Sequence, residues 1–194
     1  LSTSLASFRI FSFDFFFAYR LINPKVMLIV LSCGKPNLIR SFPLNFFPMI
    51  LILGIGFGTG LNALMTCLEA QKRNLNIQYV AVEAYPVSLE TVQSLNYSAV
   101  LPDLEANDFF TKIHAAEWEI PTIITDNFTI TKVKKRFENL TYQNQFDIIY
   151  FDAFAPNSQP ELWTKDLMQI MYNTLLPKGI LTTYCAKGQV KRNM

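Results

Sequence analysis

The first residues suited to chemistry are three closely spaced glycines, Gly56, Gly58 and Gly60. They follow the short apolar run 51–55, and after Gly60 the apolar positions take helical spacing. Glycine allows a tight turn in which the backbone comes close to a ligand. A helix that begins at such a turn presents free N–H groups and the positive end of its dipole, which attract a carboxylate or a phosphate. The stretch therefore predicts a buried strand, a ligand-binding loop and a helix.

The spacing of these glycines narrows the class of ligand. Dinucleotide-binding enzymes carry G-x-G-x-x-G, whereas this chain has Leu61 where the third glycine of that pattern would fall. The observed G-x-G-x-G after a strand resembles the first motif of class I S-adenosyl-L-methionine (SAM) methyltransferases. The alternative is a glycine-rich turn in some other α/β domain.

Glu83 lies at the end of a second apolar run, 77–83, about 20 residues beyond the loop. A carboxylate at that edge of a parallel sheet can accept hydrogen bonds from both hydroxyls of a ribose. The alternative is an exposed acid in a turn. Tyr85, two residues further on, is a candidate to border the adenine.

Asp152 ends a third apolar run, in Asp152-Ala-Phe-Ala-Pro156. Methyl transfer to an amine needs a neutral nitrogen held in line with the methyl group. A carboxylate can accept the N–H bonds of the amine, aim its lone pair and stabilise the developing ammonium. Phe154 then becomes a candidate wall of the substrate pocket. The alternative is an aspartate that only caps the next turn.

These residues lie on a predicted α/β fold with a doubly wound, mostly parallel, Rossmann-like sheet. Residues 1–48 are rich in Phe and receive no function, and residues 49–194 form the predicted domain. A capping-box pattern at Ser158–Glu161 begins one of the helices. The predicted strands are 49–55, 77–83, 128–133, 146–152 and 180–185, and the predicted helices are 61–73, 86–97, 103–117 and one that begins near 158.

The composition excludes several classes of protein. The net charge of +2, with 16% charged residues, does not suit a strongly basic nucleic-acid coat. Cys33, Cys67 and Cys185 are far apart and odd in number, so we expect a reducing, cytoplasmic compartment rather than a disulfide framework. His114 is the single histidine, so we expect no metal site and a structural or surface role for it. The run 26–33 is too short to span a membrane.

Three further motifs identify a family. In order, they are Asp152-Ala-Phe-Ala-Pro156, Pro160-Glu-Leu-Trp163 and Leu181-Thr-Thr-Tyr-Cys-Ala-Lys-Gly188. Together with the glycine loop they closely resemble the MnmC-type methyltransferases, over residues 51–192. The resemblance implies a class I methyltransferase fold and SAM as cofactor. It implies methylation of the aminomethyl group on a tRNA wobble uridine, giving 5-methylaminomethyl-(2-thio)uridine, and an FAD-dependent oxidase as a fused or separate partner.

The resemblance also implies roles for individual residues. Asp152 is the expected catalytic residue, at the target amine. The expected cofactor-binding residues are Gly56, Phe57, Gly58, Thr59, Gly60, Asn62, Glu83, Tyr85 and Asp152. The expected substrate-binding residues are Phe154, Pro156, Trp163, Tyr184 and Lys187. Lys132, Lys134, Lys135, Arg136, Lys187, Lys191 and Arg192 are candidates for contacts with tRNA phosphates, or else a solvated surface.

The chain departs from the family pattern at several points. Gly54 stands where the first motif usually has an acid, and Arg136 stands where an acid near the adenine is usual, with Glu138 nearby. Residues 1–48 lack the family's N-terminal motifs. The chain stops at Met194, so we expect the domain to lack its last strands and to keep an open sheet edge.

These departures keep two other hypotheses open. One is a truncated or degenerate fragment without catalytic activity. The other is an aminopropyltransferase-like enzyme, which would use decarboxylated SAM and polyamines. A nicotinamide enzyme is the least favoured because of Leu61.

Overall fold

The computed structural model describes residues 29–32, 49–97, 101, 104–185 and 187–194. Most of the Phe-rich segment 1–48 therefore lies outside the described residues. The chain divides into two compact units. Unit 1 comprises Leu1–Ser41 and Thr141–Met194, and unit 2 comprises Phe42–Leu140.

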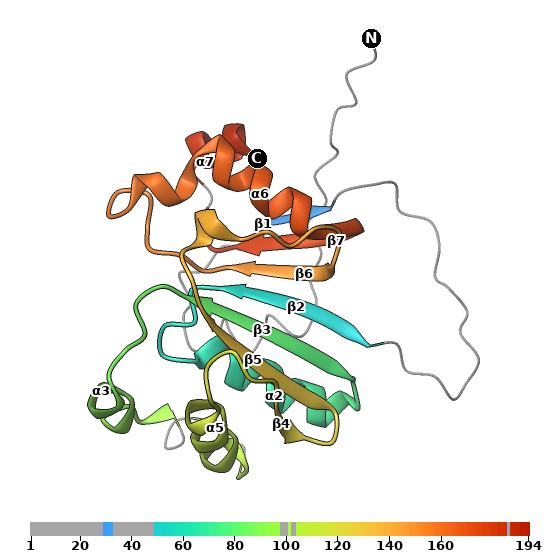
Figure 1. The fold of residues 1–194 in the computed structure, drawn as a ribbon, viewed down its shortest axis with the longest axis vertical. Helices are drawn as coiled ribbons and strands as arrows, with labels where there is room; N and C mark the ends of the chain where they lie inside the picture. The colour runs from blue at the N-terminus through green and yellow to red at the C-terminus, as the bar shows by residue number, and fades with distance from the viewer. Residues whose placement is uncertain (1–28, 33–48, 98–100, 102–103, 186) are drawn as a thin grey trace, which may run out of the picture. The chain divides into compact units, whose positions relative to one another are not determined.

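Unit 2 is built on parallel strands joined by helical crossovers. Its strands lie in the order β2-β3-β5-β4 (Figure 1). Strands β2 and β3 are parallel, as are β3 and β5, whereas β4 and β5 form an antiparallel hairpin. The elements of unit 2 are β2 (Ile50–Ile55), α2 (Leu61–Arg73), β3 (Ile77–Glu83), α3 (Leu89–Gln93), α5 (Ala106–Ala115), β4 (Thr122–Thr125), β5 (Phe128–Lys134) and the 3₁₀ helix η1 (Phe137–Asn139).

The core of unit 2 explains why the apolar runs form central strands. Ile52, Leu53 and Ile55 in β2 are each at most 1% exposed, so this strand is covered on both faces. Helix α2 buries Leu64 and Cys67, and α5 buries Phe109, Phe110 and Ile113, the apolar positions of a helical period. These buried faces hold the glycine loop, which joins β2 to α2, on a rigid base.

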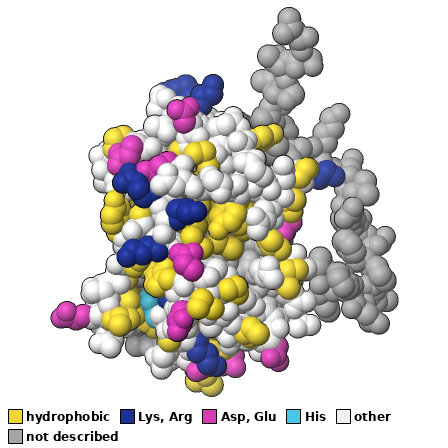
Figure 2. Space-filling model, viewed as in Figure 1, with side chains coloured by type: hydrophobic (Ala, Val, Ile, Leu, Met, Phe, Trp, Pro, Cys, Tyr) yellow, Lys and Arg dark blue, Asp and Glu magenta, His cyan; other side chains and the backbone are white. Residues whose placement is uncertain are grey.

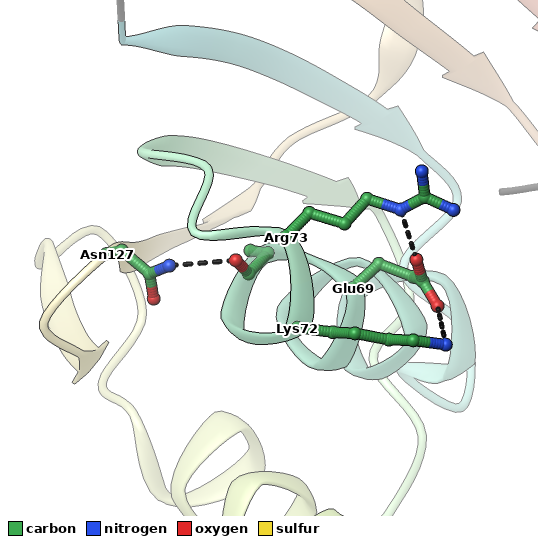
Figure 3. A network of polar contacts seen from close by, with 5 residues as sticks. Glu69, Lys72, Arg73 and Asn127 are labelled. Atoms are coloured by element: carbon green, nitrogen blue, oxygen red, sulfur yellow. Dashed lines mark hydrogen bonds and ion pairs between the residues drawn. The ribbon is translucent and has the colours of Figure 1, made fainter. Parts of the chain in front are cut away.

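The C-terminal end of α2 is tied down by polar contacts (Figure 3). The Asn127 side chain, from the β4–β5 turn, donates a 2.8 Å hydrogen bond to the carbonyl of Ala70. Asn74 then ends the helix in the left-handed region, with φ of 52°. Glu69 forms ion pairs with Arg73 at 2.7 Å and with Lys72 at 3.7 Å, and these pairs stabilise the last turn of α2.

Unit 1 carries the second set of strands. β6 (Phe146–Phe151) and β7 (Leu175–Thr183) are parallel, and β1 (Ile29–Ser32) pairs with β7 in the antiparallel direction. The crossover from β6 to β7 runs through the 3₁₀ helix η2 (Pro160–Trp163) and α6 (Lys165–Thr174). Helix α7 (Gly188–Asn193) follows β7. The predicted α/β class with mostly parallel strands is confirmed.

Most strands agree with the sequence-based boundaries, and β3 agrees residue for residue. Within the described part of the chain, β1 and β4 were not predicted, because four-residue strands carry almost no periodic signal. Strand β7 is irregular near its start, where Lys178 has a positive φ of 75°. The register moves from Phe146↔Leu175 to Ile148↔Ile180, so the residues between Leu175 and Ile180 bulge out of the ladder.

Two helix predictions were wrong at their boundaries. The helix expected over 86–97 is reduced to α3, because Ser88 rather than Pro86 caps it and accepts the N–H of Thr91. The capping box expected at Ser158–Glu161 does not form. Pro160 begins the 3₁₀ helix η2 instead, and Thr164 caps α6 by accepting the N–H of Leu167.

The thiols in the described residues are free. Cys67 and Cys185 are both buried, and burial, followed by the charge of Glu105, raises the pKa of Cys67 to about 12. Cys33 lies outside the described residues. Among the described residues no group of three or more His, Cys, Asp or Glu could hold a metal ion. No helix in that part of the chain is long and apolar enough to cross a bilayer.

Candidate active site

The glycine loop joins β2 to α2 in unit 2. Gly56, Gly58 and Gly60 have φ values of 84°, 51° and 77°, a region that side chains with a Cβ rarely adopt. The loop is anchored below, where the Val82 carbonyl accepts the N–H groups of Gly56 and Phe57 at 3.0 and 3.2 Å. A Cβ placed on Gly58 would meet nothing within 4 Å, so the loop leaves open space above this glycine. A ligand can therefore approach the backbone there.

Helix α2 begins directly after this loop. Gly60 is its N-cap, no side chain caps it, and its first turn holds no acid. The N–H groups and dipole at this end are thus oriented for the negative group of a ligand. This geometry agrees with the anion-binding role predicted from the sequence.

Glu83 ends β3 beside the loop. Its Oε2 accepts the N–H of Gly58 at 3.1 Å, and its Oε1 accepts the N–H of Tyr85 at 3.0 Å. An ionised carboxylate offers about four lone-pair sites, so each oxygen keeps capacity for a ribose hydroxyl. The loop and Glu83, predicted separately from the sequence, are therefore brought together by direct hydrogen bonds.

Tyr85, Arg136 and Glu138 form a polar group close to Glu83. The Tyr85 side chain is 73% exposed, and Arg136 Nη1 donates to its hydroxyl at 3.4 Å. Arg136 Nε also donates to Glu138 Oε1 at 2.5 Å. A hydrogen bond from its own backbone, followed by Arg136, lowers the pKa of Glu138. Arg136 occupies the position where the family pattern has an acid near the adenine, and Glu138 is an acid in direct contact with Arg136.

Three other predicted loop residues make contacts within the protein. The Phe57 ring is 8% exposed and packs beneath the loop, so Phe57 acts here as an anchor. The hydroxyls of Thr59 and Tyr97 lie 2.7 Å apart. Asn62 lies in the first turn of α2, where its carbonyl accepts the Thr66 hydroxyl at 2.6 Å.

Gly54 has a steric reason to be glycine. A Cβ at this position would overlap the Tyr79 hydroxyl and lie 2.9 Å from two carbons of the Tyr79 ring. Tyr79 is 3% exposed and lies on the neighbouring strand. The acid that the family pattern has at this position is therefore replaced by a glycine–tyrosine packing pair.

Asp152 follows β6 in unit 1 and is half-buried. The Tyr184 hydroxyl donates to the carbonyl of Ala153 at 2.9 Å and holds the segment beside Asp152. Burial, and then the negative charge of Asp152, raises the pKa of Tyr184. Tyr184 is therefore a neutral donor near pH 7, and it lies close enough to Asp152 to be influenced by its charge.

The loop after Asp152 presents Phe154 and is supported by Trp163. Phe154 is 72% exposed, and its carbonyl accepts the indole N–H of Trp163 at 2.7 Å. Trp163 is 3% exposed and packs edge-to-face against Phe151 and Tyr184. Asn193 donates to the Trp163 carbonyl at 2.6 Å, a support that the sequence did not reveal. Trp163 therefore supports the loop, while Phe154 is exposed and Pro156 is half-buried.

The candidate phosphate-binding residues differ in their exposure. Lys187 is exposed and donates to Asn157 at 2.6 Å, and Lys191 and Arg192 are exposed on α7. Lys132 is 3% exposed and donates to the carbonyl of His114, so its predicted contact with phosphate is wrong. Figure 2 shows acidic and basic side chains interspersed on the viewed face, in agreement with the small net charge.

Comparison with known proteins finds similarity to methyltransferases. Residues 110–194 match the model of a family described as S-adenosyl-L-methionine-dependent methyltransferase. The chain is 29% identical over 157 residues to the tRNA 5-methylaminomethyl-2-thiouridine biosynthesis bifunctional protein MnmC of Pseudomonas savastanoi pv. phaseolicola. It is 30% identical over 152 residues to the protein of the same name from Pseudomonas fluorescens.

These matches cover most of this chain but only part of each relative. They cover 74% and 73% of this chain but 23% of each relative, so the chain spans about a quarter of their length. Among solved structures, MNMC2 from Aquifex aeolicus is similar with a TM-score of 0.58 and 23% identity. That match covers 75% of this chain and 45% of the other, and it shows a shared fold.

Proposed function

We propose that this chain, an S-adenosyl-L-methionine-dependent methyltransferase related to the methyltransferase domain of MnmC, methylates the aminomethyl group of a tRNA wobble uridine. The product would be 5-methylaminomethyl-(2-thio)uridine. The predicted family resemblance is supported by the MnmC relatives, and the predicted cofactor class by the family match over residues 110–194. The observation that carries the proposal is the hydrogen bond from the Gly58 N–H to Glu83, which joins the glycine loop to the acid that ends β3.

The residues of unit 2 suit the cofactor. The open space above Gly58 admits a ligand close to the backbone, and the N-terminus of α2 suits its carboxylate. The free lone pairs of Glu83 suit the ribose hydroxyls, and the exposed ring of Tyr85 offers a surface for the adenine. When bound, SAM supplies an electrophilic methyl group on a sulfonium.

The residues of unit 1 suit the amine. We assign Asp152 to accept the N–H bonds of the neutral amine, so that the nitrogen lone pair is aimed and the developing ammonium is stabilised. The Tyr184 bond to Ala153 keeps this segment in place. The exposed Phe154 ring offers a stacking face for a base, as is usual where proteins bind unpaired nucleotides.

The basic residues on the surface of unit 1 suit the tRNA backbone. Lys187, Lys191 and Arg192 are close in sequence and exposed. Contacts of this kind make affinity depend on salt, with a slope that grows with the number of phosphates neutralised. Replacing the three by Gln should weaken tRNA binding at low salt and reduce that slope, while SAM binding stays unchanged.

The test separates cofactor binding from turnover. Calorimetric titration with SAM should show saturable binding by the wild-type chain, and binding about tenfold weaker or worse for Glu83→Gln. Asp152→Asn should keep SAM affinity within about threefold. Its methylation of tRNA carrying the aminomethyl group should fall by about a hundredfold or more, as when one stabilising group of a transition state is removed.

Asp126→Asn is the matched control, because Asp126 is an exposed acid in the β4–β5 turn. It should behave as the wild type in both assays. A folded wild-type chain that binds no SAM would contradict the proposal. A polyamine product formed from decarboxylated SAM would replace it with aminopropyl transfer.

A further inference from the structure

An aromatic and cationic cluster lies under the glycine loop in unit 2 and has no part in the chemistry assigned above. The His114 ring lies 4.5 Å from Phe110 and 5.4 Å from Phe57, measured between ring centroids. Lys132 Nζ lies 5.7 Å from the centroid of Phe57 and 5.2 Å from that of Trp118. Helix α5 and strand β5 thus contribute a packed support for the loop.

His114 touches the loop itself. Its Nε2 lies 3.2 Å from the carbonyl oxygen of Thr59, between the second and third glycines. A Cβ placed on Gly60 would lie 2.8 Å from the same nitrogen, so the ring fills the space beside Gly60. The Thr59 hydroxyl is held on its other side by Tyr97. The centre of the loop is therefore fixed by two contacts from residues far along the chain.

The contact with Thr59 determines the tautomer of His114. A carbonyl oxygen only accepts hydrogen bonds, so the ring nitrogen that meets it carries the hydrogen. Lys132 Nζ donates to the backbone carbonyl of His114 at 2.8 Å, which places a cation beside the ring. Burial lowers the pKa of His114, the bond to Thr59 opposes this, and Lys132 lowers it further. The ring is thus neutral near pH 7, with its hydrogen on Nε2.

We propose that His114 is a positioning residue for the cofactor, which holds the Gly56–Gly60 loop in its binding form through an Nε2–H bond to the Thr59 carbonyl. The inference rests on the proposed function, because it takes this loop as the SAM site. His114 itself touches neither cofactor nor substrate in this account. Its effect is on the free energy that the loop needs to become ordered when the cofactor binds.

The matched pair His114→Gln and His114→Met tests this. In both variants the terminal atom lies four bonds from Cα, as Nε2 does in histidine, but only Gln has an N–H there to donate. Both residues are good helix formers, which suits α5. We expect His114→Gln to bind SAM within about twofold of the wild type, and His114→Met to bind about three- to tenfold more weakly, the range for one net hydrogen bond.

The two proposals fail in different ways in this titration. Equal SAM affinities for the Gln and Met variants, with the wild type binding, would overturn the positioning role alone. No binding by the wild type would overturn both. Thermal unfolding without SAM separates general stability from positioning. If the role of His114 were purely structural, His114→Met would unfold at a lower temperature but would bind SAM with wild-type affinity at temperatures where the variant is folded.

Ring nitrogen NMR gives a second, independent measurement. The chain has one histidine, so a labelled sample gives one set of imidazole signals without further assignment. We expect the neutral ring to carry its hydrogen on Nε2, and the signals to shift on addition of SAM. A neutral ring with its hydrogen on Nδ1 would overturn the inference.

Discussion

At the scale of single residues, the buried Tyr79 ring restricts position 54 to glycine. Gly54→Ala should lower the free energy of unfolding by about 1–3 kcal/mol, because the new Cβ collides with a buried ring. Chemical denaturation measures this. The loss should be smaller in a Tyr79→Leu background, and a double-mutant cycle without coupling would contradict the packing account.

His114 should make the stability depend on pH. Its folded pKa is lowered, so the unfolded chain binds more protons between that value and the ordinary value of about 6.5. The stabilising contribution is therefore complete above about pH 6.5 and is lost as the pH falls through the folded pKa. The nearby cation is Lys132 on β5, while Lys112 on α5 itself is paired with Asp108.

Denaturation curves for the wild type and His114→Gln measure this dependence. Carboxylates titrate in both proteins, so the difference between the two curves isolates the histidine. As the pH falls below about 6.5, the wild type should lose free energy of unfolding relative to His114→Gln. A difference that stays constant from pH 7.5 to pH 5 would show that His114 is not buried as a neutral ring.

At the scale of elements, mutation can show whether Thr164 or Ser158 caps the helix that ends in α6. Thr164→Ala should cost about 1 kcal/mol of stability, because the Thr164 hydroxyl accepts the N–H of Leu167. Thr164→Ser should cost little, since it keeps the hydroxyl. Ser158→Ala should stay within about 0.5 kcal/mol, because Ser158 is exposed and is not the cap. A larger effect at Ser158 than at Thr164 would restore the capping box expected from the sequence.

At the scale of the whole molecule, cofactor binding should raise the resistance to heat. A ligand at 100 times its Kd adds about 2.7 kcal/mol to the free energy of unfolding. For a chain of 194 residues this corresponds to a rise of roughly 5–10 °C in the midpoint. The rise should be smaller for Glu83→Gln at the same SAM concentration and unchanged for Asp126→Asn. Equal rises in the wild type and Glu83→Gln would exclude Glu83 from the cofactor site.

The sequence by itself determined the elements whose signal is local. Apolar runs predicted β2, β3 and β6, because a strand covered on both faces is rich in apolar residues. The alternation of apolar and polar residues predicted β5. The G-x-G-x-G spacing predicted a tight turn, and in the structure all three glycines have positive φ values, which glycine adopts without strain. The acids at the ends of β3 and β6 were found in the same way, and their roles in binding and catalysis stay predictions.

Only the tertiary structure decided what covers each side chain. Lys132 was expected at the surface as a lysine, yet the rings of Phe57 and Trp118 and the carbonyl of His114 enclose it. From the sequence, Gly54 was only a departure from the acid that the family pattern has there, whereas the structure shows that the Tyr79 ring leaves no room for a side chain. A structural or surface role was expected for His114, and the structure shows which residue it contacts, Thr59, which lies 55 positions earlier in the chain. Such contacts form between elements distant in sequence, so no local pattern of residue types carries them.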